Sequence, residues 1–183
     1  MSEAHTTTGG VPVIESQRLI MRGHRRDDFA DCVAMWADPR VTRHIGGKSL
    51  AAEEVWARIL RYAGLWSLLG FGYWVIVDKV SGRFVGEVGF ADFKRSIEPP
   101  FGTAPEIGWA LAPWAHGAGL ATEAVRAAVA WGDGNLGPVR TVCLIQPDNI
   151  ASIRVAEKCG YQEFERTTYK DRPTMLFQRS GQN

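Results

Sequence analysis

The sequence predicts a single α/β domain built on a mixed β-sheet. Segments with the two-residue alternation of strands are interspersed with segments whose apolar residues recur every three or four positions, as on a helix face. Their order is strand, two helices, three strands, helix, strand, helix and two strands, with no internal repeat and no interdomain linker. A central twisted sheet of about seven strands, with about four helices on both faces, buries these segments economically.

Length and composition limit the class of protein. The 183 residues suit one domain, which we place at residues 11–183 behind a polar, flexible tail at residues 1–10. A formal net charge of +1 provides no electrostatic basis for binding nucleic acid or an anionic membrane. No apolar run reaches about 18 residues and the N-terminus has no signal-peptide pattern, so we expect a cytoplasmic protein. The three cysteines lie in apolar surroundings, which favours buried thiols over disulfides.

The first half of the chain predicts a strand, two helices and a hairpin. N-capping side chains and closing glycine or proline residues mark the helix ends. The expected elements are an edge strand at 18–22, a helix from Asp27 or Asp28 to Asp38-Pro39, a helix from Ser49 to Gly70, and hairpin strands at 71–78 and 84–93. The glycine-containing loop at 41–48 joins the two helices, and we expect it to form one wall of a cleft.

The second half predicts alternating strands and helices and then a final hairpin. Proline and glycine residues indicate an irregular loop at 92–105. The expected elements are a strand at 106–111, a helix from Ala121 to about Trp131 that breaks at Gly132-Asp133-Gly134, a strand at 139–146, a helix capped by Asn149 and closed by Gly160, and hairpin strands at 164–169 and 174–178.

A glycine turn joins the strand at 106–111 to the following helix. The first amides of a helix have no intrahelical partner, and the helix dipole favours an anion at this point. Gly117 and Gly119 allow the main chain to approach a phosphate without a side-chain clash. The turn lacks the third glycine of a Rossmann loop and the Gly-Lys-Ser/Thr of a P-loop, so its spacing excludes those two nucleotide-binding loops.

Three segments of the chain carry a family resemblance. They are Arg18-Leu19-Ile20-Met21-Arg22, then Glu106-Ile107-Gly108-Trp109 through Thr122-Glu123-Ala124, and finally Asn149-Ile150-Ala151-Ser152 to Glu157-Lys158-Cys159-Gly160-Tyr161. In this order and spacing they resemble the GNAT superfamily of acetyl-CoA-dependent N-acetyltransferases, specifically the RimJ/RimL-like branch that includes ribosomal-protein N-terminal acetyltransferases. The resemblance covers about Arg18 to Gln178 and implies the GNAT fold with acetyl-CoA as cosubstrate.

The resemblance also implies where the cofactor binds. We expect the backbone of Trp109, Ala110 and Leu111 to hold the pantetheine arm between this strand and the next parallel strand. Asn149 and Ser152 are expected to reach the cofactor from the following strand–helix junction. The family's phosphate loop falls on His116, Gly117, Ala118, Gly119, Leu120 and Ala121, followed by the amide of Thr122. Its first position is His where the family has Gln or Arg, and by its place in the frame His116 is expected to be a phosphate partner rather than a proton carrier.

The implied reaction is attack of an amine on the thioester carbonyl, which requires removal of a proton from the ammonium ion. Positioning supplies much of the rate, so a modest base is enough. Glu106, which opens the strand of the pantetheine contacts, is the first candidate for this base, and Glu87 is the second; the alternative for each is an ordinary exposed carboxylate. Ser152 is a candidate donor to the leaving thiolate, unless it only bonds the first turn of its own helix. Ala156 occupies the place of the tyrosine acid found in many relatives, which excludes an acid there.

Several tryptophans are candidates for the acceptor site. Trp36, Trp74 and Trp114 are expected to border it, with core packing as the competing interpretation for each. His24 and His44 lack companions at metal-ligand spacing, so no metal is predicted.

These observations predict an N-acetyltransferase that transfers the acetyl group of acetyl-CoA to a primary amine, either a protein N-terminus or a small molecule. The alternative is a non-catalytic acyl-CoA-binding sensor or partner protein that has kept the loop without turnover. The residues do not identify the acceptor, because different members of one fold use different acceptors. A homodimer is compatible with the sequence.

Overall fold

The computed structural model describes residues 7–8 and 10–181, which contain ten strands and five α-helices. The strands are β1 (Thr7–Thr8), β2 (Val11–Pro12), β3 (Ile14–Glu15), β4 (Leu19–Arg22), β5 (Tyr73–Asp78), β6 (Phe84–Ala91), β7 (Glu106–Leu111), β8 (Arg140–Ile145), β9 (Gln162–Tyr169) and β10 (Arg172–Ser180). The helices are α1 (Phe29–Ala37), α2 (Pro39–Thr42), α3 (Ala52–Leu69), α4 (Leu120–Asn135) and α5 (Ile150–Lys158), with 3₁₀ turns η1 (Arg26–Asp28) and η2 (Pro113–Ala115).

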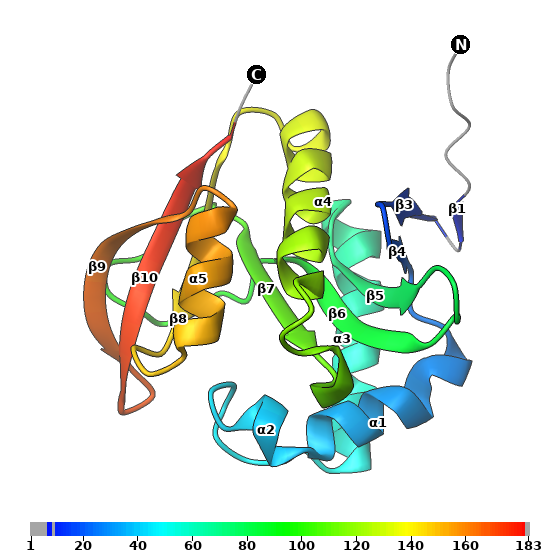
Figure 1. The fold of residues 1–183 in the computed structure, drawn as a ribbon. Coiled ribbons are helices and arrows are strands. Elements are labelled where there is room, and N and C mark those ends of the chain that lie inside the picture. Colours follow the sequence, from blue (N-terminus) through cyan, green and yellow to red (C-terminus); the bar gives the residue numbers. More distant parts are fainter. Residues whose placement is uncertain (1–6, 9, 182–183) are drawn as a thin grey trace.

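Eight of these strands form one mixed sheet in the order β3-β4-β5-β6-β7-β8-β10-β9 (Figure 1). All neighbouring strands are antiparallel except β7 and β8, which are parallel. The predicted α/β class with a mixed sheet is confirmed. The sheet has one strand more than expected, because the two-residue strand β3 pairs with the outer edge of β4.

Helices cover both faces of the sheet (Figure 1). On one side, which we call the α3 face, α1 and α3 pack against β5, β6 and β7 around Trp36, Ile59 and Val75. On the other, the α4 face, α4 and α5 enclose the largest apolar cluster, which includes Trp74, Val125 and Ala156. The sheet therefore separates two apolar clusters, one on each face.

Several predicted element ends are confirmed. Gly70 and Gly160 end α3 and α5 with left-handed backbones at φ 72° and 86°. Asn149 caps α5, its side-chain oxygen accepting a hydrogen bond from the Ser152 amide at 3.2 Å. The three cysteines are free and buried, as the apolar surroundings predicted.

Two predicted element ends are wrong. Helix α4 does not break at Gly132 but runs on to Asn135, because Gly132 is buried where its missing side chain leaves room for the Phe90 ring. Ser49 does not cap α3; its hydroxyl instead donates to the Ala37 carbonyl at 2.7 Å, and the helix begins after Ala51.

The expected flexible tail, residues 1–10, lies largely outside the described residues. Within it, Thr7–Thr8 pairs in antiparallel fashion with Val11–Pro12. Among the helices that the structure describes, none combines the length and the apolar character needed to cross a membrane.

Candidate functional site

The parallel strands β7 and β8 diverge from a single point. Their only register pair is Glu106 with Val142, where the Val142 amide donates to the Pro105 carbonyl at 3.0 Å. Beyond this pair the two strands separate, and at the wide end β7 leads through η2 into the predicted glycine turn. The gap is part of a cleft of about 680 Å³.

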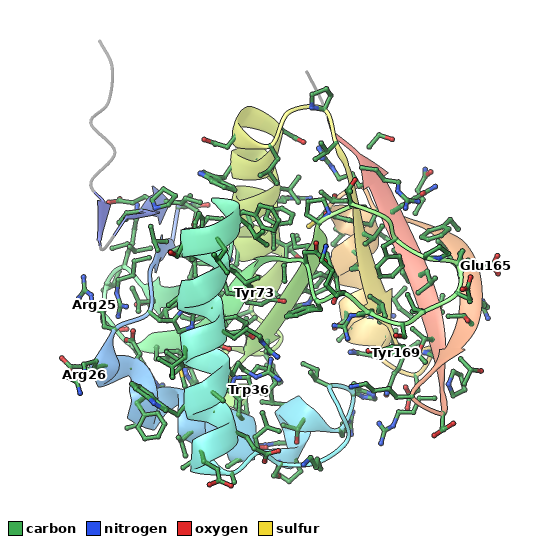
Figure 2. The ribbon with its side chains drawn as sticks, turned by 180° about the vertical axis from the view of Figure 1, so that it is seen from behind. Arg25, Arg26, Trp36, Tyr73, Glu165 and Tyr169 are labelled. Carbon is green, nitrogen blue, oxygen red and sulfur yellow. The ribbon has the colours of Figure 1, made fainter. Side chains whose placement is uncertain are left out.

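The walls of this cleft come from distant parts of the chain. The loop between α2 and α3 contributes His44, Ile45 and Gly46, which confirms the wall expected from its glycines. Beside this loop, the adjoining ends of β9 and β10 contribute Tyr169 and Arg172, and Arg172 donates to the Arg43 carbonyl at 3.5 Å. Figure 2 shows Trp36 and Tyr73 close to α3 and Tyr169 on the β9 side.

The register of β6 and β7 shows which backbone groups point into the gap. The Ala112 amide donates to the Val85 carbonyl at 2.8 Å, which fixes the hydrogen-bonded pairs of this antiparallel ladder. By alternation Ala110 also directs its backbone groups to β6, whereas Trp109 and Leu111 direct theirs toward β8. The backbone contacts expected from Trp109 and Leu111 fit this geometry, but the contact expected from Ala110 does not.

The glycine turn has the geometry of an anion site. Gly117 and Gly119 both have φ of 76°, a left-handed conformation that side chains disfavour. The Glu123 amide makes the first i to i−4 bond of α4, to the Gly119 carbonyl at 3.1 Å, so the amides of Leu120, Ala121 and Thr122 precede the intrahelical ladder. These free amides and the N-terminal end of the helix dipole lie where the sequence predicted a backbone cradle, and its binding of a phosphate remains a prediction.

The His116 side chain contacts the end of β7. Its Nε2 atom lies 2.8 Å from the Leu111 carbonyl oxygen. This contact holds the turn against the end of β7 and occupies one of the backbone groups expected to meet pantetheine. Only the other ring nitrogen of His116 is then left for a phosphate, and the expected role of this residue as a phosphate partner remains a prediction.

The turn is anchored to the segment between β3 and β4, a contact that sequence reasoning missed. Glu123, in the first turn of α4, accepts hydrogen bonds at 2.7 Å from the Ser16 hydroxyl, the Arg18 amide and Arg18 Nε. Arg18 Nη1 also donates to the Ala118 carbonyl at 2.9 Å. Burial alone would raise the pKa of Glu123, but the bonds from Arg18 and Ser16 lower it. An arginine at the start of a strand and a glutamate in the first helical turn were the available signals.

On the α3 face, Glu87 is a buried carboxylate with fixed partners. It is 1 % exposed and accepts hydrogen bonds from His24 Nε2 at 2.8 Å, Trp36 Nε1 at 2.9 Å and the Cys32 thiol at 3.5 Å. Burial raises its pKa, but His24, Arg58 and Trp36 together lower it, so the carboxyl is ionised at neutral pH. Glu87 is therefore not the solvent-facing strand residue of the competing interpretation.

His24 was expected to have no other potential metal ligands near it, and the structure differs. The potential ligand atoms of His24, Cys32 and Glu87 all lie within 4.8 Å of one another. Hydrogen bonds already link them, and burial strongly raises the pKa of the Cys32 thiol, which favours its protonated form. We assign no metal here, and the expected absence of a metal remains a prediction.

Glu106 lies at the point where β7 and β8 meet, and it forms an ion pair. Arg95, from the irregular loop, approaches both oxygens: Nη2 to Oε1 at 2.7 Å and Nε to Oε2 at 2.5 Å. Arg95 Nη1 also donates to the Tyr169 hydroxyl at 3.1 Å. Burial opposes the charge of Arg95, but its contacts with Glu106 raise its pKa. Glu106 is 7 % exposed and lines the cleft, so it is neither a free carboxylate nor a simple exposed strand end.

Tyr73 is a site residue that sequence reasoning did not find. A side chain added at Gly108 would lie 2.2 Å from the Tyr73 hydroxyl oxygen, so this phenol approaches the backbone of β7 directly. The ring stacks on Tyr62, with centroids 4.2 Å apart. Burial, then the nearby Tyr62 and Glu106, raise the pKa of Tyr73, so the hydroxyl keeps its proton at neutral pH. The glycine at 108 was the one sequence signal of this close approach.

The remaining candidates divide between cleft and core. Asn149 and Ser152 line the cleft at the junction of β8 and α5. Ala156, at the place of a family acid, is fully buried. Tyr161 is also buried and bonds the Thr141 hydroxyl at 2.7 Å, so it packs in the core as expected.

The three tryptophans predicted to border the acceptor site have different places. Trp36 lines the cleft. Trp74 does not: it is 0 % exposed on the α4 face, packs against other tryptophan rings and donates to the Pro12 carbonyl at 2.9 Å. Trp114 is 40 % exposed outside the cleft lining, where its indole donates to the Phe84 carbonyl. For Trp74 the competing interpretation, core packing, is correct.

An open pair of parallel strands beside a glycine turn at a helix start is the geometry that the family resemblance implied. The chain belongs to the GNAT acetyltransferase family: residues 18–162 match the family model described as "Acetyltransferase (GNAT) domain".

Curated and solved relatives agree with this assignment. The Bacillus subtilis (strain 168) protein YkkB is 36 % identical over 115 residues, which cover 62 % of this chain and 64 % of YkkB, just under two thirds of its length. The N-acetyltransferase YoaA of the same organism is 27 % identical over 153 residues, covering 83 % of this chain and 84 % of YoaA. A GNAT-family acetyltransferase structure from Bordetella pertussis has a TM-score of 0.80 and 31 % identity, covering 91 % of this chain and 98 % of that one.

Proposed function

We propose that this protein transfers the acetyl group of acetyl-CoA to a primary amine. The observation that carries the proposal is the parallel strand pair that joins only at Glu106 and Val142, with a left-handed glycine turn at the wide end. Pantetheine would bind between β7 and β8 through the backbone of Trp109, and the pyrophosphate would bind the amides at residues 117–122. Two proteins of the same fold have been solved with CoA: RimL (18 % identity, TM-score 0.74) and spermidine N-acetyltransferase from Vibrio cholerae (14 % identity, TM-score 0.73).

The acceptor would approach from the α3 face. Alternation along β7 places Glu106, Gly108 and Ala110 on the face that also carries Tyr73 and the Glu87 carboxylate. Gly108 has no side chain and Ala110 has only a methyl group, so neither residue would cover the thioester from this face. The reacting carbonyl would then lie close to Gly108, beneath the Tyr73 hydroxyl.

In the proposed reaction, the amine nitrogen attacks the thioester carbonyl, the carbon–nitrogen bond forms, the carbon–sulfur bond breaks, and CoA leaves as a thiolate. We assign the proton released by the ammonium to Glu106, directly or through a water molecule, because this carboxylate lines the cleft at the start of β7, on the same face as Gly108. Glu87, which is only 1 % exposed and accepts hydrogen bonds from His24, Trp36 and Cys32, would contribute fixed negative charge instead.

Two groups are candidates to stabilise the leaving sulfur. The Tyr73 hydroxyl is neutral and points at β7, so it would donate a hydrogen bond to the thiolate from the α3 face. Ser152 would do so from the β8 side of the gap. Tyr73→Phe and Ser152→Ala distinguish the two, because only the true donor would lower kcat while leaving acetyl-CoA affinity unchanged.

Acceptor-dependent release of CoA tests the function itself. The purified chain is incubated with acetyl-CoA and a panel of small amines and peptides, free thiol is measured, and mass spectrometry identifies the acetylated product. We expect stoichiometric CoA and N-acetyl product for at least one acceptor. Tight acetyl-CoA binding without release for any acceptor would favour the alternative, a non-catalytic acyl-CoA sensor.

A further inference from the structure

The acceptor side of the cleft carries both carboxylates and guanidinium groups. Each cleft-lining carboxylate there has a cationic or hydrogen-bonding partner: Glu106 has Arg95, Asp92 has Lys94, and Glu87 has His24. Arg58, by contrast, lines the same cleft without a carboxylate within ion-pair distance among the residues that the structure describes. Burial opposes the charge of Arg58, and the buried Glu87 carboxylate is near enough to raise its pKa, but Glu87 makes no ion pair with it, so the guanidinium keeps donors for a ligand.

Contacts on two sides hold this guanidinium in place. Its central carbon lies 4.1 Å from the centroid of the Trp36 ring, and Nη1 donates to the Tyr62 hydroxyl at 2.9 Å. Tyr62 in turn stacks on Tyr73 with an interplanar angle of 6°. An arginine has five N–H donors in a rigid fork, and here the Tyr62 bond occupies one nitrogen. The remaining donors are pre-organised for a planar, bidentate anion.

The position of Arg58 assigns this anion to the acceptor rather than to the cofactor. Arg58 projects from α3 and shares the Trp36 indole with Glu87, so it belongs to the α3 face. The phosphates of CoA would bind at the start of α4, which packs on the opposite face of the sheet. A second cation, Arg61, lines the same side of the cleft over the Phe93 ring at 5.0 Å.

We propose that the amine acceptor carries a carboxylate, which Arg58 binds while the amine faces Gly108 and the thioester. This inference rests on the proposed acetyltransferase function and names its substrate class: carboxylate-bearing primary amines such as amino acids and short peptides. Polycationic amines would instead meet repulsion from Arg58 and Arg61. Spermidine N-acetyltransferase, a structural neighbour at 14 % identity, is named for a substrate of that disfavoured class.

Matched acceptor pairs test this inference. Each amino acid or dipeptide is compared with its C-terminal amide, which keeps the amine and removes only the anionic charge, and spermidine is added as a polycation. We expect wild-type kcat/KM to favour the acid over its amide by about tenfold or more, since a charge-assisted bidentate pair is lost. In Arg58→Gln the preference should fall to about unity through a higher KM, with acetyl-CoA affinity unchanged; Arg58→Lys should retain part of it.

Arg83→Gln is the matched control. Arg83 also stacks on a tryptophan, 4.0 Å from the Trp114 centroid, but lies outside the cleft lining, so its loss should leave the preference unchanged. Equal use of acids and amides, or spermidine as the best acceptor, would overturn the inference and leave the acetyltransferase function standing. If no amine is acetylated, the proposed function itself fails. Should Arg58→Gln not fold, the wild-type pairs and Arg58→Lys still decide the question.

Discussion

The two sides of the cleft are built by different means. The side proposed to bind the cofactor, here the cofactor side, consists mostly of backbone: the edge of β7, the left-handed glycines of the turn and the first amides of α4. The acceptor side consists of side chains from α1, α3, β5, β6 and the loop before β7, held in a network of hydrogen bonds and stacked rings. Substitutions that change the backbone conformation should therefore impair the cofactor side. Substitutions that remove a functional group should impair the acceptor side.

The largest expected effect is on the cofactor side. Gly119→Val places a β-branched residue at φ 76° in the turn and should weaken acetyl-CoA binding by about 100-fold or more. Isothermal titration calorimetry with acetyl-CoA measures the change. Gly134→Ala is the matched control, because nothing lies within 4 Å of a side chain added at that helical position. Unchanged binding in Gly119→Val would mean that the turn is not the cofactor site.

The next largest effect is expected at Gly108, where the cofactor side and the acceptor side meet. Gly108→Ala should lower kcat by about 100-fold, since the added methyl would overlap the Tyr73 hydroxyl, 2.2 Å away, and displace the phenol or the thioester. In a Tyr73→Phe background the added methyl meets only the ring carbon, at 3.4 Å, so the same glycine change should then cost much less. Additive losses in the double variant would show that the contact with Tyr73 is not the cause.

A change confined to the acceptor side should spare the cofactor. Glu106→Gln should lower kcat by about 10- to 100-fold, as expected for loss of a general base, and leave the Kd for acetyl-CoA within about twofold. Asp92→Asn, also in the cleft and also paired with a cation, is the control and should retain activity. Wild-type turnover in Glu106→Gln would remove this residue from the proton-accepting role.

The smallest effect concerns the stability of the anchor on the cofactor side. The pKa of Glu123 is lowered in the folded state, so its contribution is fully present above the unfolded pKa of about 4.3 and is lost as pH falls through the folded pKa. Glu123→Gln should therefore reduce the free energy of unfolding by about 1–2 kcal/mol at pH 7, and by less near pH 3. Urea denaturation at both pH values measures this, and a difference independent of pH would contradict the ionic origin.

The sequence predicted the helices, strands and glycine turn better than it predicted the side-chain contacts of the acceptor side. Period-two and helical patterns identified most elements, and the glycine turn was placed correctly, because these features depend on local backbone preferences. Helix α4 was predicted too short, since a local glycine signal at Gly132 was overridden by tertiary contact with Phe90.

Side-chain partners could not be predicted in the same way. Glu106 was expected as a candidate base, but its partner Arg95 lies in an irregular loop whose path the sequence does not specify. His24 and Glu87 are 63 residues apart in the chain and meet only because β6 lies beneath the segment before α1. The direction of the Trp74 side chain likewise depends on which face of β5 each helix covers.

Trp36 links two charged groups, since one indole supports the Arg58 guanidinium with its face and donates its N–H to Glu87. A smaller residue at this position would release both at once, leaving a buried carboxylate short of a donor and an arginine free to reorient. New acceptor preferences are therefore more accessible to substitution at Arg172, on the β10 side of the cleft, than at the tryptophan or at Tyr169, whose hydroxyl holds Arg95. Single substitutions are therefore better tolerated on the β10 side of the cleft. On the α3 side, a change at Trp36 alters the surroundings of Arg58 and Glu87 together.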